Sequence, residues 1–203
     1  MPATPKAWKA AERAFRTHRG VLRTSQAIAL GVHPRVLYAL RDAGRLQQLS
    51  RGVYRLSTLP DLTEPDLATV ASRVPNGVIC LISALAFHGL TTQIPHVVDV
   101  ALPRGTKKPR LDFPPIRVNR FSGAALTSGI ETRVLDGIRV RVYRPAKTVA
   151  DCFKFRNRIG LDVALEGLRA WRERKLGTVE DLLGYARICR VQAVIRPYLE
   201  AIL

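Results

Sequence analysis

The side chains in this sequence best suited to chemistry are cationic and aromatic residues within the first 56 positions. Arg35, Tyr38 and Arg41 recur every three residues, so a helix would carry them on one surface. From such a surface, these side chains can reach the base edges in the major groove of a duplex. We therefore predict that these three residues contact bases. Contacts with backbone phosphates are predicted for a second set, namely Thr24, Ser25, Arg45, Arg51 and Arg55.

Motifs of catalytic and metal sites are missing from the sequence. There is no HExxH, no GxSxG and no Walker A loop. None of the four histidines, at 18, 33, 88 and 96, has a neighbour at metal-ligand spacing. Only 16 acidic residues stand against 33 Lys and Arg, which disfavours a two-metal site built from carboxylates. We therefore predict no catalytic residue, no metal and no cofactor, and a protein that is not an enzyme.

Positive charge is concentrated at the N-terminal end of the chain. The formal net charge is +17 and the isoelectric point is about 11.0, which predicts a polyanionic partner. Residues 1–59 hold eleven Lys and Arg but only Glu12 and Asp42, a net charge of +9. This asymmetry favours an N-terminal nucleic-acid module over a generally basic protein.

The elements that would position the candidate residues follow the order of a helix-turn-helix. Thr4 and Pro5 are typical of a helix start, and this first helix is expected to end by Gly20. A short helix over 26–30 and a turn at Gly31 come next, and a third helix begins with Pro34. The third helix would bury its apolar residues and leave the proposed base contacts outside.

A β-hairpin is expected over residues 46–56, with its turn at 50–52. A basic hairpin directly after a recognition helix is a wing, so the sequence predicts a winged helix-turn-helix. Two prolines and several hydroxyl side chains make 57–65 the best linker candidate. We predict an α+β protein with a winged helix-turn-helix domain over 1–58 and an α/β domain with a mixed sheet and C-terminal helices over 59–203.

Alternation and turn residues indicate the strands of the second domain. Residues 78–81, 96–102 and 116–121 are expected to be strands. The turn Asp136-Gly137 between alternating segments predicts a hairpin over 131–143. From Pro145 onward the sequence is expected to be helical, with a capping box at 178–181.

Three further groups of residues have a plain structural interpretation. Cys80, Cys152 and Cys189 lie in apolar surroundings and are expected to be buried, reduced thiols. Lys147 and Asp151 are four residues apart and are expected to pair on a helix surface. The cations of the loop over 104–110 either bind phosphate or belong to an ordinary exposed loop: Arg104, Lys107, Lys108 and Arg110.

The sequence has no apolar run of membrane-spanning length and no signal-peptide core at its start. Together with the unpaired cysteines, this predicts a cytoplasmic protein without a membrane partner.

Three segments resemble the AbiEi family of antitoxins, the transcriptional-regulator half of type IV toxin–antitoxin systems. They are residues 46–55, residues 79–91 with 100–104, and residues 142–156. The resemblance implies an N-terminal winged helix followed by a C-terminal α/β antitoxin domain. It also implies a repressor of its own operon that binds inverted repeats in the promoter. The implied partners are double-stranded DNA and a nucleotidyltransferase toxin that is countered without a stable complex.

The resemblance carries DNA contacts only to the winged-helix residues named above, and it assigns no antitoxin residue. The oligomeric state stays open, and a monomer that binds DNA cooperatively is one arrangement. Two other functions also stay open, a nuclease-like enzyme brought to DNA by a winged helix and an RNA- or protein-binding module. A basic surface that is merely solvated is the plainest alternative.

Overall fold

The computed structural model describes residues 4–202, and the chain divides into two compact units. The first unit is Met1–Pro75 together with Val134–Val140, and the second is Asn76–Arg133 together with Arg141–Leu203. The predicted boundary after residue 58 therefore lies within the first unit. The first unit extends beyond residue 58 because it also contains the helix Pro65–Arg73 and the tip of a β-hairpin, residues Val134–Val140.

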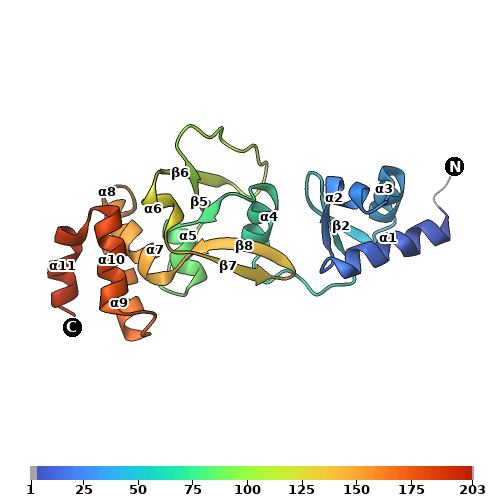
Figure 1. Ribbon diagram of the computed structural model, residues 1–203. Coiled ribbons are helices and arrows are strands. Elements are labelled where there is room, and N and C mark those ends of the chain that lie inside the picture. Colours follow the sequence, from blue (N-terminus) through green and yellow to red (C-terminus); the bar gives the residue numbers. More distant parts are fainter. Residues whose placement is uncertain (1–3, 203) are drawn as a thin grey trace. The chain divides into compact units, whose positions relative to one another are not determined.

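The first unit begins with three helices and a three-stranded antiparallel sheet in the order β1-β3-β2 (Figure 1). This order fits a winged helix-turn-helix. The three-residue strand β1 was not predicted, and helix α4 follows the sheet. In chain order, the elements are α1 (Pro5–Thr17), β1 (Val21–Arg23), α2 (Thr24–Ala29), α3 (Pro34–Asp42), β2 (Leu46–Ser50), β3 (Val53–Leu56) and α4 (Pro65–Arg73).

Local hydrogen bonds explain where the first two helices, α1 and α2, begin. The Thr4 hydroxyl accepts a hydrogen bond from the Ala7 amide at 3.4 Å, with Pro5 in the first turn. Helix α2 begins two residues earlier than predicted, because it already includes Thr24 and Ser25. The side-chain oxygen of Gln26 accepts a hydrogen bond from the Arg23 amide at 2.9 Å.

The second unit is built on a five-stranded sheet, with two helices between its strands and, within the described residues, five after them. The strand order is β6-β5-β4-β8-β7. The β4–β5 pair is antiparallel, whereas β4–β8 and β5–β6 are parallel, so the predicted mixed sheet is confirmed. In chain order, the elements are β4 (Val78–Ile79), α5 (Leu81–Phe87), β5 (Val98–Pro103), β6 (Ile116–Phe121), α6 (Ala124–Thr127), β7 (Ile130–Leu135), β8 (Ile138–Tyr143), α7 (Pro145–Lys154), α8 (Arg156–Ile159), α9 (Leu161–Glu173), α10 (Val179–Cys189) and α11 (Gln192–Glu200).

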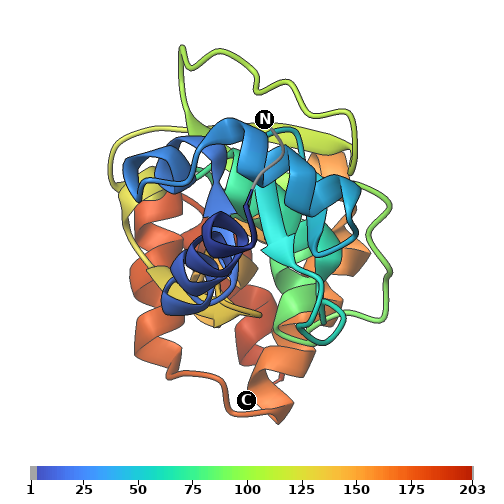
Figure 2. The same cartoon turned by 90° about the vertical axis from the view of Figure 1, so that its right-hand side faces the viewer.

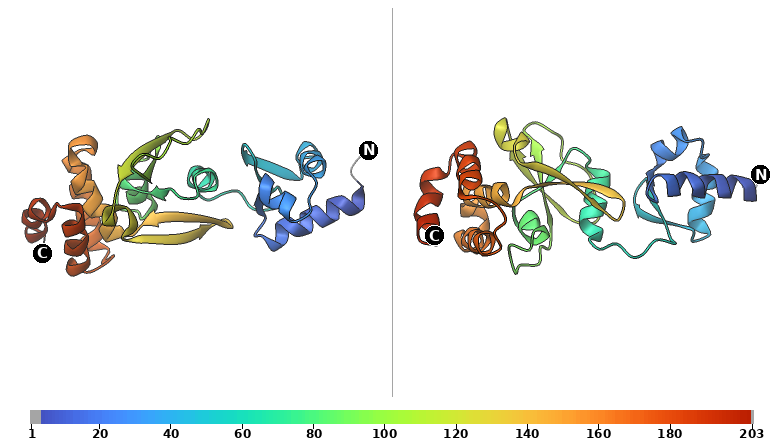
Figure 3. Two further views of the ribbon diagram at one scale, coloured as in Figure 1. Left: turned by 45° about the horizontal axis from the view of Figure 1, so that its top comes forward. Right: turned by 60° about the horizontal axis from the view of Figure 1, so that its bottom comes forward.

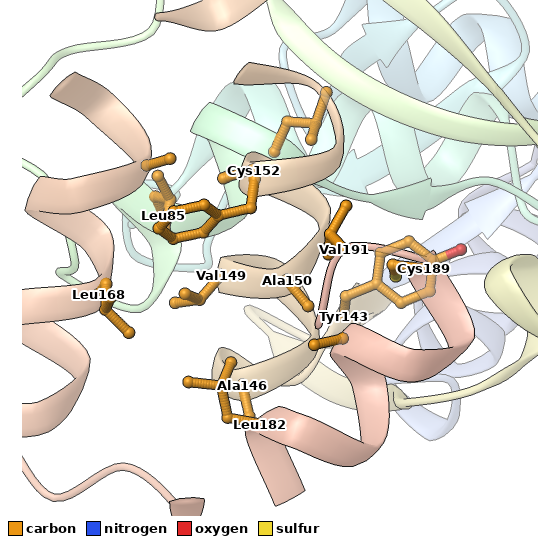
Figure 4. Close-up of a cluster of buried hydrophobic side chains, with 14 of the residues drawn as sticks. Leu85, Tyr143, Ala146, Val149, Ala150, Cys152, Leu168, Leu182, Cys189 and Val191 are labelled. Atoms are coloured by element: carbon orange, nitrogen blue, oxygen red, sulfur yellow. The ribbon is translucent and has the colours of Figure 1, made fainter. Parts of the chain in front are cut away.

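Helix α7 is the centre of the second unit's core. It packs against α5, α9, α10 and α11, so every residue from Ala146 to Phe153 is buried. Figure 4 shows Ala146, Val149 and Cys152 of this helix among side chains from α5, α9 and α10. The views in Figure 3 show helices α9, α10 and α11, coloured orange to red, grouped together at one side of the second unit.

The expected surface position of the Lys147–Asp151 pair is wrong. The two side chains do pair, with Nζ 2.5 Å from one carboxylate oxygen, but neither is exposed at all. The reason is that α7 is covered on more than one side, so its polar face is enclosed as well as its apolar face. The three cysteines are free and buried, as predicted.

Candidate nucleic-acid interface

Helix α3 places the three proposed base-contacting residues together on its exposed side. Its N-terminus is fixed by His33, whose Nδ1 accepts a hydrogen bond from the Arg35 amide at 3.1 Å, and by Pro34 in the first turn. The opposite side is anchored in the first unit's core, because Val36, Leu37 and Leu40 are buried. Burial of those apolar residues leaves Arg35, Tyr38 and Arg41 facing outward.

Two of these residues form a stacked pair. The Arg41 guanidinium lies 5.2 Å from the centre of the Tyr38 ring, and Tyr38 is 42% exposed. Arg41 also pairs with Asp42 at 2.7 Å, and this hydrogen bonding raises the pKa of Arg41 above its usual value. The Arg41 guanidinium therefore stays protonated and lies over the Tyr38 ring, and the Asp42 carboxylate offsets part of its positive charge.

The turn between β2 and β3 lies beside the start of α2. The Thr24 amide donates a hydrogen bond to the Gly52 carbonyl oxygen at 2.9 Å, and Gly52 has the positive φ of 76° that this turn requires. Ser25 and Arg51 are both exposed. The structure thus brings three of the predicted phosphate contacts to one place, Thr24, Ser25 and Arg51.

Arg45 is exposed but already has partners within the first unit. Its Nε lies 3.0 Å from a Glu12 carboxylate oxygen, and its guanidinium lies 5.9 Å from the centre of the Trp8 ring. Its side chain is 54% exposed, so one side of the guanidinium remains open to solvent. Arg45 therefore has a structural role in joining the start of β2 to α1, besides any contact with a phosphate.

The prediction that Arg55 contacts a phosphate is wrong. Arg55 is only 3% exposed, and its guanidinium donates a hydrogen bond to the carbonyl oxygen of Pro60. The physical reason is that β3 is the middle strand of the sheet and all four of its residues are buried. A charge in that position cannot reach a nucleic-acid backbone.

Sequence reasoning passed over two apolar residues close to these sites in the chain. Ile28 in α2 and Leu30 just after it are 48% and 43% exposed. The sequence could have indicated their exposure, because a helix as short as α2 cannot bury every apolar side chain in and beside it. Exposed apolar side chains beside a recognition helix can contact the methyl group of thymine.

Two further observations concern other kinds of site. Within residues 4–202, no three His, Cys, Asp or Glu side chains gather in a way that could hold a metal ion. No helix in the described part of the chain is both long and apolar enough to cross a membrane.

Comparison with known proteins supports the resemblance found in the sequence. Residues 10–57 match the model of a family described as "Transcriptional regulator, AbiEi antitoxin". This match covers α2, α3 and the wing, and therefore every residue of the candidate interface. A search of curated proteins gave no match.

A solved structure shares the fold over nearly the whole chain. It is the crystal structure of the RV2827C protein from Mycobacterium tuberculosis, with a TM-score of 0.54 and 15% sequence identity. The alignment covers 98% of this chain and 83% of that one. At this level of identity, the likeness concerns the fold alone.

Proposed function

We propose that this chain, whose residues 10–57 match the AbiEi transcriptional-regulator family, is a DNA-binding repressor and antitoxin of a type IV toxin–antitoxin system. In this proposal it works in the cytoplasm, binds inverted repeats in the promoter of its own operon and counters a nucleotidyltransferase toxin without a stable complex. It acts by binding and not by catalysis.

One observation carries the DNA-binding part of the proposal. Helix α3 is capped at its start, anchored by buried leucines and exposes Arg35, Tyr38 and Arg41 on its outer side. The major groove admits one helix, whose exposed side chains reach base edges while neighbouring groups hold phosphates. The net charge of +9 over residues 1–59 supports the same partner.

The decisive experiment measures fluorescence anisotropy of labelled duplexes with the full-length protein. The probes are the operon's own upstream inverted repeat and a scrambled duplex of equal composition, each at several salt concentrations. We expect at least tenfold tighter binding to the repeat and a steep loss of affinity with salt. Equal affinity for both duplexes would overturn sequence-specific repression.

The matched variants separate base contacts from phosphate contacts. Arg51→Ala should weaken binding to both duplexes alike and reduce the salt slope by roughly 0.9 per bound copy, the value for one phosphate. Arg172→Ala removes an exposed charge from α9 in the second unit and serves as the control, which should change neither quantity. A change of preference at one base position in Arg51→Ala would show that the division of roles is wrong.

Two further arms test the functions that the sequence left open. A single-stranded RNA of the same sequence should bind more weakly than the duplex, and tighter binding would favour an RNA-binding module. Supercoiled plasmid incubated with the protein and Mg²⁺ should stay intact, and cleavage would favour a nuclease. The antitoxin part predicts that the neighbouring gene encodes a nucleotidyltransferase, and that co-expression with this chain rescues growth from that toxin. An unrelated neighbouring gene, or no rescue, would contradict the antitoxin part.

A further inference from the structure

The second unit contains a cavity of about 530 Å³ whose rim is strongly cationic. The cavity lies where β5 and β6 end, beside α6 and the C-terminal ends of α7 and α10. Four cations from four different parts of the chain line it, namely Arg104 after β5, Arg120 in β6, Lys154 at the end of α7 and Arg190 after α10.

These four charges lack carboxylate partners in the described residues, because none of them belongs to an ion pair there. The only acidic residue that lines the cavity is Asp151, and its carboxylate is already held by Lys147 at 2.5 Å. Four like charges around one cavity repel each other, and a bound anion would relieve that repulsion.

The guanidinium of one of the four cations is held by a hydrogen bond, and a second cation follows α10 at a strained backbone position. Arg120 Nη1 donates a hydrogen bond to the Pro103 carbonyl oxygen at 3.0 Å, which directs its guanidinium along the end of β5. Arg190 ends α10 in the left-handed conformation with φ of 58°, a position where glycine is usual. The chain therefore places a long cationic side chain at a turn where glycine would fit with less strain.

Part of the cavity wall is apolar and aromatic. Phe121 and Phe155 both line it, with their ring centres 5.3 Å apart. Ile188 lines the cavity too and is 36% exposed. A cavity lined by both cations and flat apolar groups suits a ligand that combines phosphate with an aromatic ring.

We propose that this cavity binds a nucleoside phosphate, with its phosphate groups against Arg104, Arg120, Lys154 and Arg190 and its base against the apolar wall. The nucleoside phosphate is either a free nucleotide or the phosphorylated end of a nucleic-acid strand. Arginine forks match phosphate oxygens in pairs, whereas the lysine adds a point charge. This site uses none of the residues of the α3 interface.

Isothermal titration calorimetry of the full-length protein tests the site with defined probes. These are ATP, AMP, adenosine, inorganic phosphate and an adenine-containing pentanucleotide with and without a 5′-phosphate. We expect dissociation constants in the micromolar range for phosphorylated probes and at least tenfold weaker binding of adenosine. Inorganic phosphate should bind at least tenfold more weakly than AMP, because it lacks the base.

Variants connect the binding to this cavity. Arg120→Gln keeps a donor for the Pro103 carbonyl oxygen but removes the charge, and it should weaken nucleotide binding about tenfold, as should Arg190→Gln. Arg172→Gln on the exposed face of α9 removes the same charge elsewhere in the second unit and should leave binding unchanged. A thermal melt of each variant confirms that it is folded.

The outcomes separate the two sources of the ligand, and they separate the cavity site from the repressor function. Binding of ATP and AMP supports a free nucleotide, whereas binding only of the 5′-phosphorylated strand supports a strand end. No binding by any probe at millimolar concentration, or equal weakening by Arg172→Gln, would overturn the site. Operator binding by Arg120→Gln should stay normal, so failure of the cavity is distinguishable from failure of the repressor proposal.

Discussion

Replacing Lys147 by methionine should destabilise the second unit by about 3–5 kcal/mol, because the change leaves the Asp151 carboxylate buried without its cation. In the native structure, Nζ lies 2.6 and 2.5 Å from the two carboxylate oxygens and 4.2 Å from the centre of the Tyr143 ring. An exposed helix pair with the same spacing contributes only about 0.3–0.5 kcal/mol. The size of the loss therefore reports whether the pair is buried.

A double variant completes the cycle. In Lys147→Met with Asp151→Leu, both charges are gone and apolar groups of similar size fill their places. Such replacements of buried pairs are often neutral or stabilising, so we expect the double variant to be within about 1 kcal/mol of the wild type or above it. The double variant also loses the contacts of the Lys147 ammonium with the rings of Tyr143 and Phe121 and the weak hydrogen bond from the Cys189 thiol to Asp151.

The assay is urea unfolding followed by tryptophan fluorescence. The chain has two tryptophans, Trp8 in the first unit and Trp171 in the core of the second. A Trp8→Phe background therefore leaves one reporter for the unit that contains the ion pair. In a thermal melt, the single variant should lose roughly 6–20 °C at about 2–4 °C per kcal/mol.

Two results would refute this reasoning. A loss under about 0.5 kcal/mol in Lys147→Met would mean that the pair is solvated. A double variant that loses as much as the sum of both single variants would mean that the two residues act independently and not as a pair.

Three further outcomes follow from other features of the structure. Tyr38→Ala should weaken operator binding by about 1–3 kcal/mol and reduce the preference over scrambled DNA, measured by anisotropy, whereas an unchanged preference would remove Tyr38 from the base contacts. Gly129→Ala should destabilise the second unit by at least about 1–2 kcal/mol in urea, because Gly129 has φ of 71° and an added Cβ would lie 2.9 Å from Lys147 Cβ; unchanged stability would contradict this packing. Burial raises the pKa of the Asp151 carboxyl from 3.8 to about 6, so between these pH values the folded protein binds a proton that the unfolded chain has lost. The free energy of unfolding, measured relative to Asp151→Asn, should therefore fall as pH rises from about 4 to about 6 and then level off. If the stability of the wild type relative to Asp151→Asn rose across this pH range, the pKa of Asp151 would be lowered in the folded state and the prediction would be wrong.

Local signals in the sequence predicted the elements whose ends are fixed by their own residues. Pro34 starts α3, Thr178 caps α10 through a hydrogen bond from the Asp181 amide at 3.1 Å, and the Asp136-Gly137 turn joins β7 and β8. Each of these depends on neighbours within a few positions, so the pattern is visible without knowledge of the rest of the fold.

Features that depend on distant segments were missed or misjudged. Strand β1 has only three residues and exists because β3 pairs with it, so nothing in its own sequence indicates it. Arg55 was predicted to contact a phosphate as a cation of the basic hairpin, but β3 is the middle strand and all four of its residues are buried. The sequence shows which face of an element is apolar, but not whether a later segment covers the other face as well.

The central position of α7 has a consequence for synthesis on the ribosome. The apolar cluster around α1–α3 and the wing draws only on residues up to Leu59, so it can close while the rest of the chain is still being made. Helix α7, in contrast, is enclosed partly by α10 and α11, which are the last to emerge. A nascent chain halted before those helices would present a charged and apolar helix to chaperones and proteases, with the cluster around α1–α3 already formed.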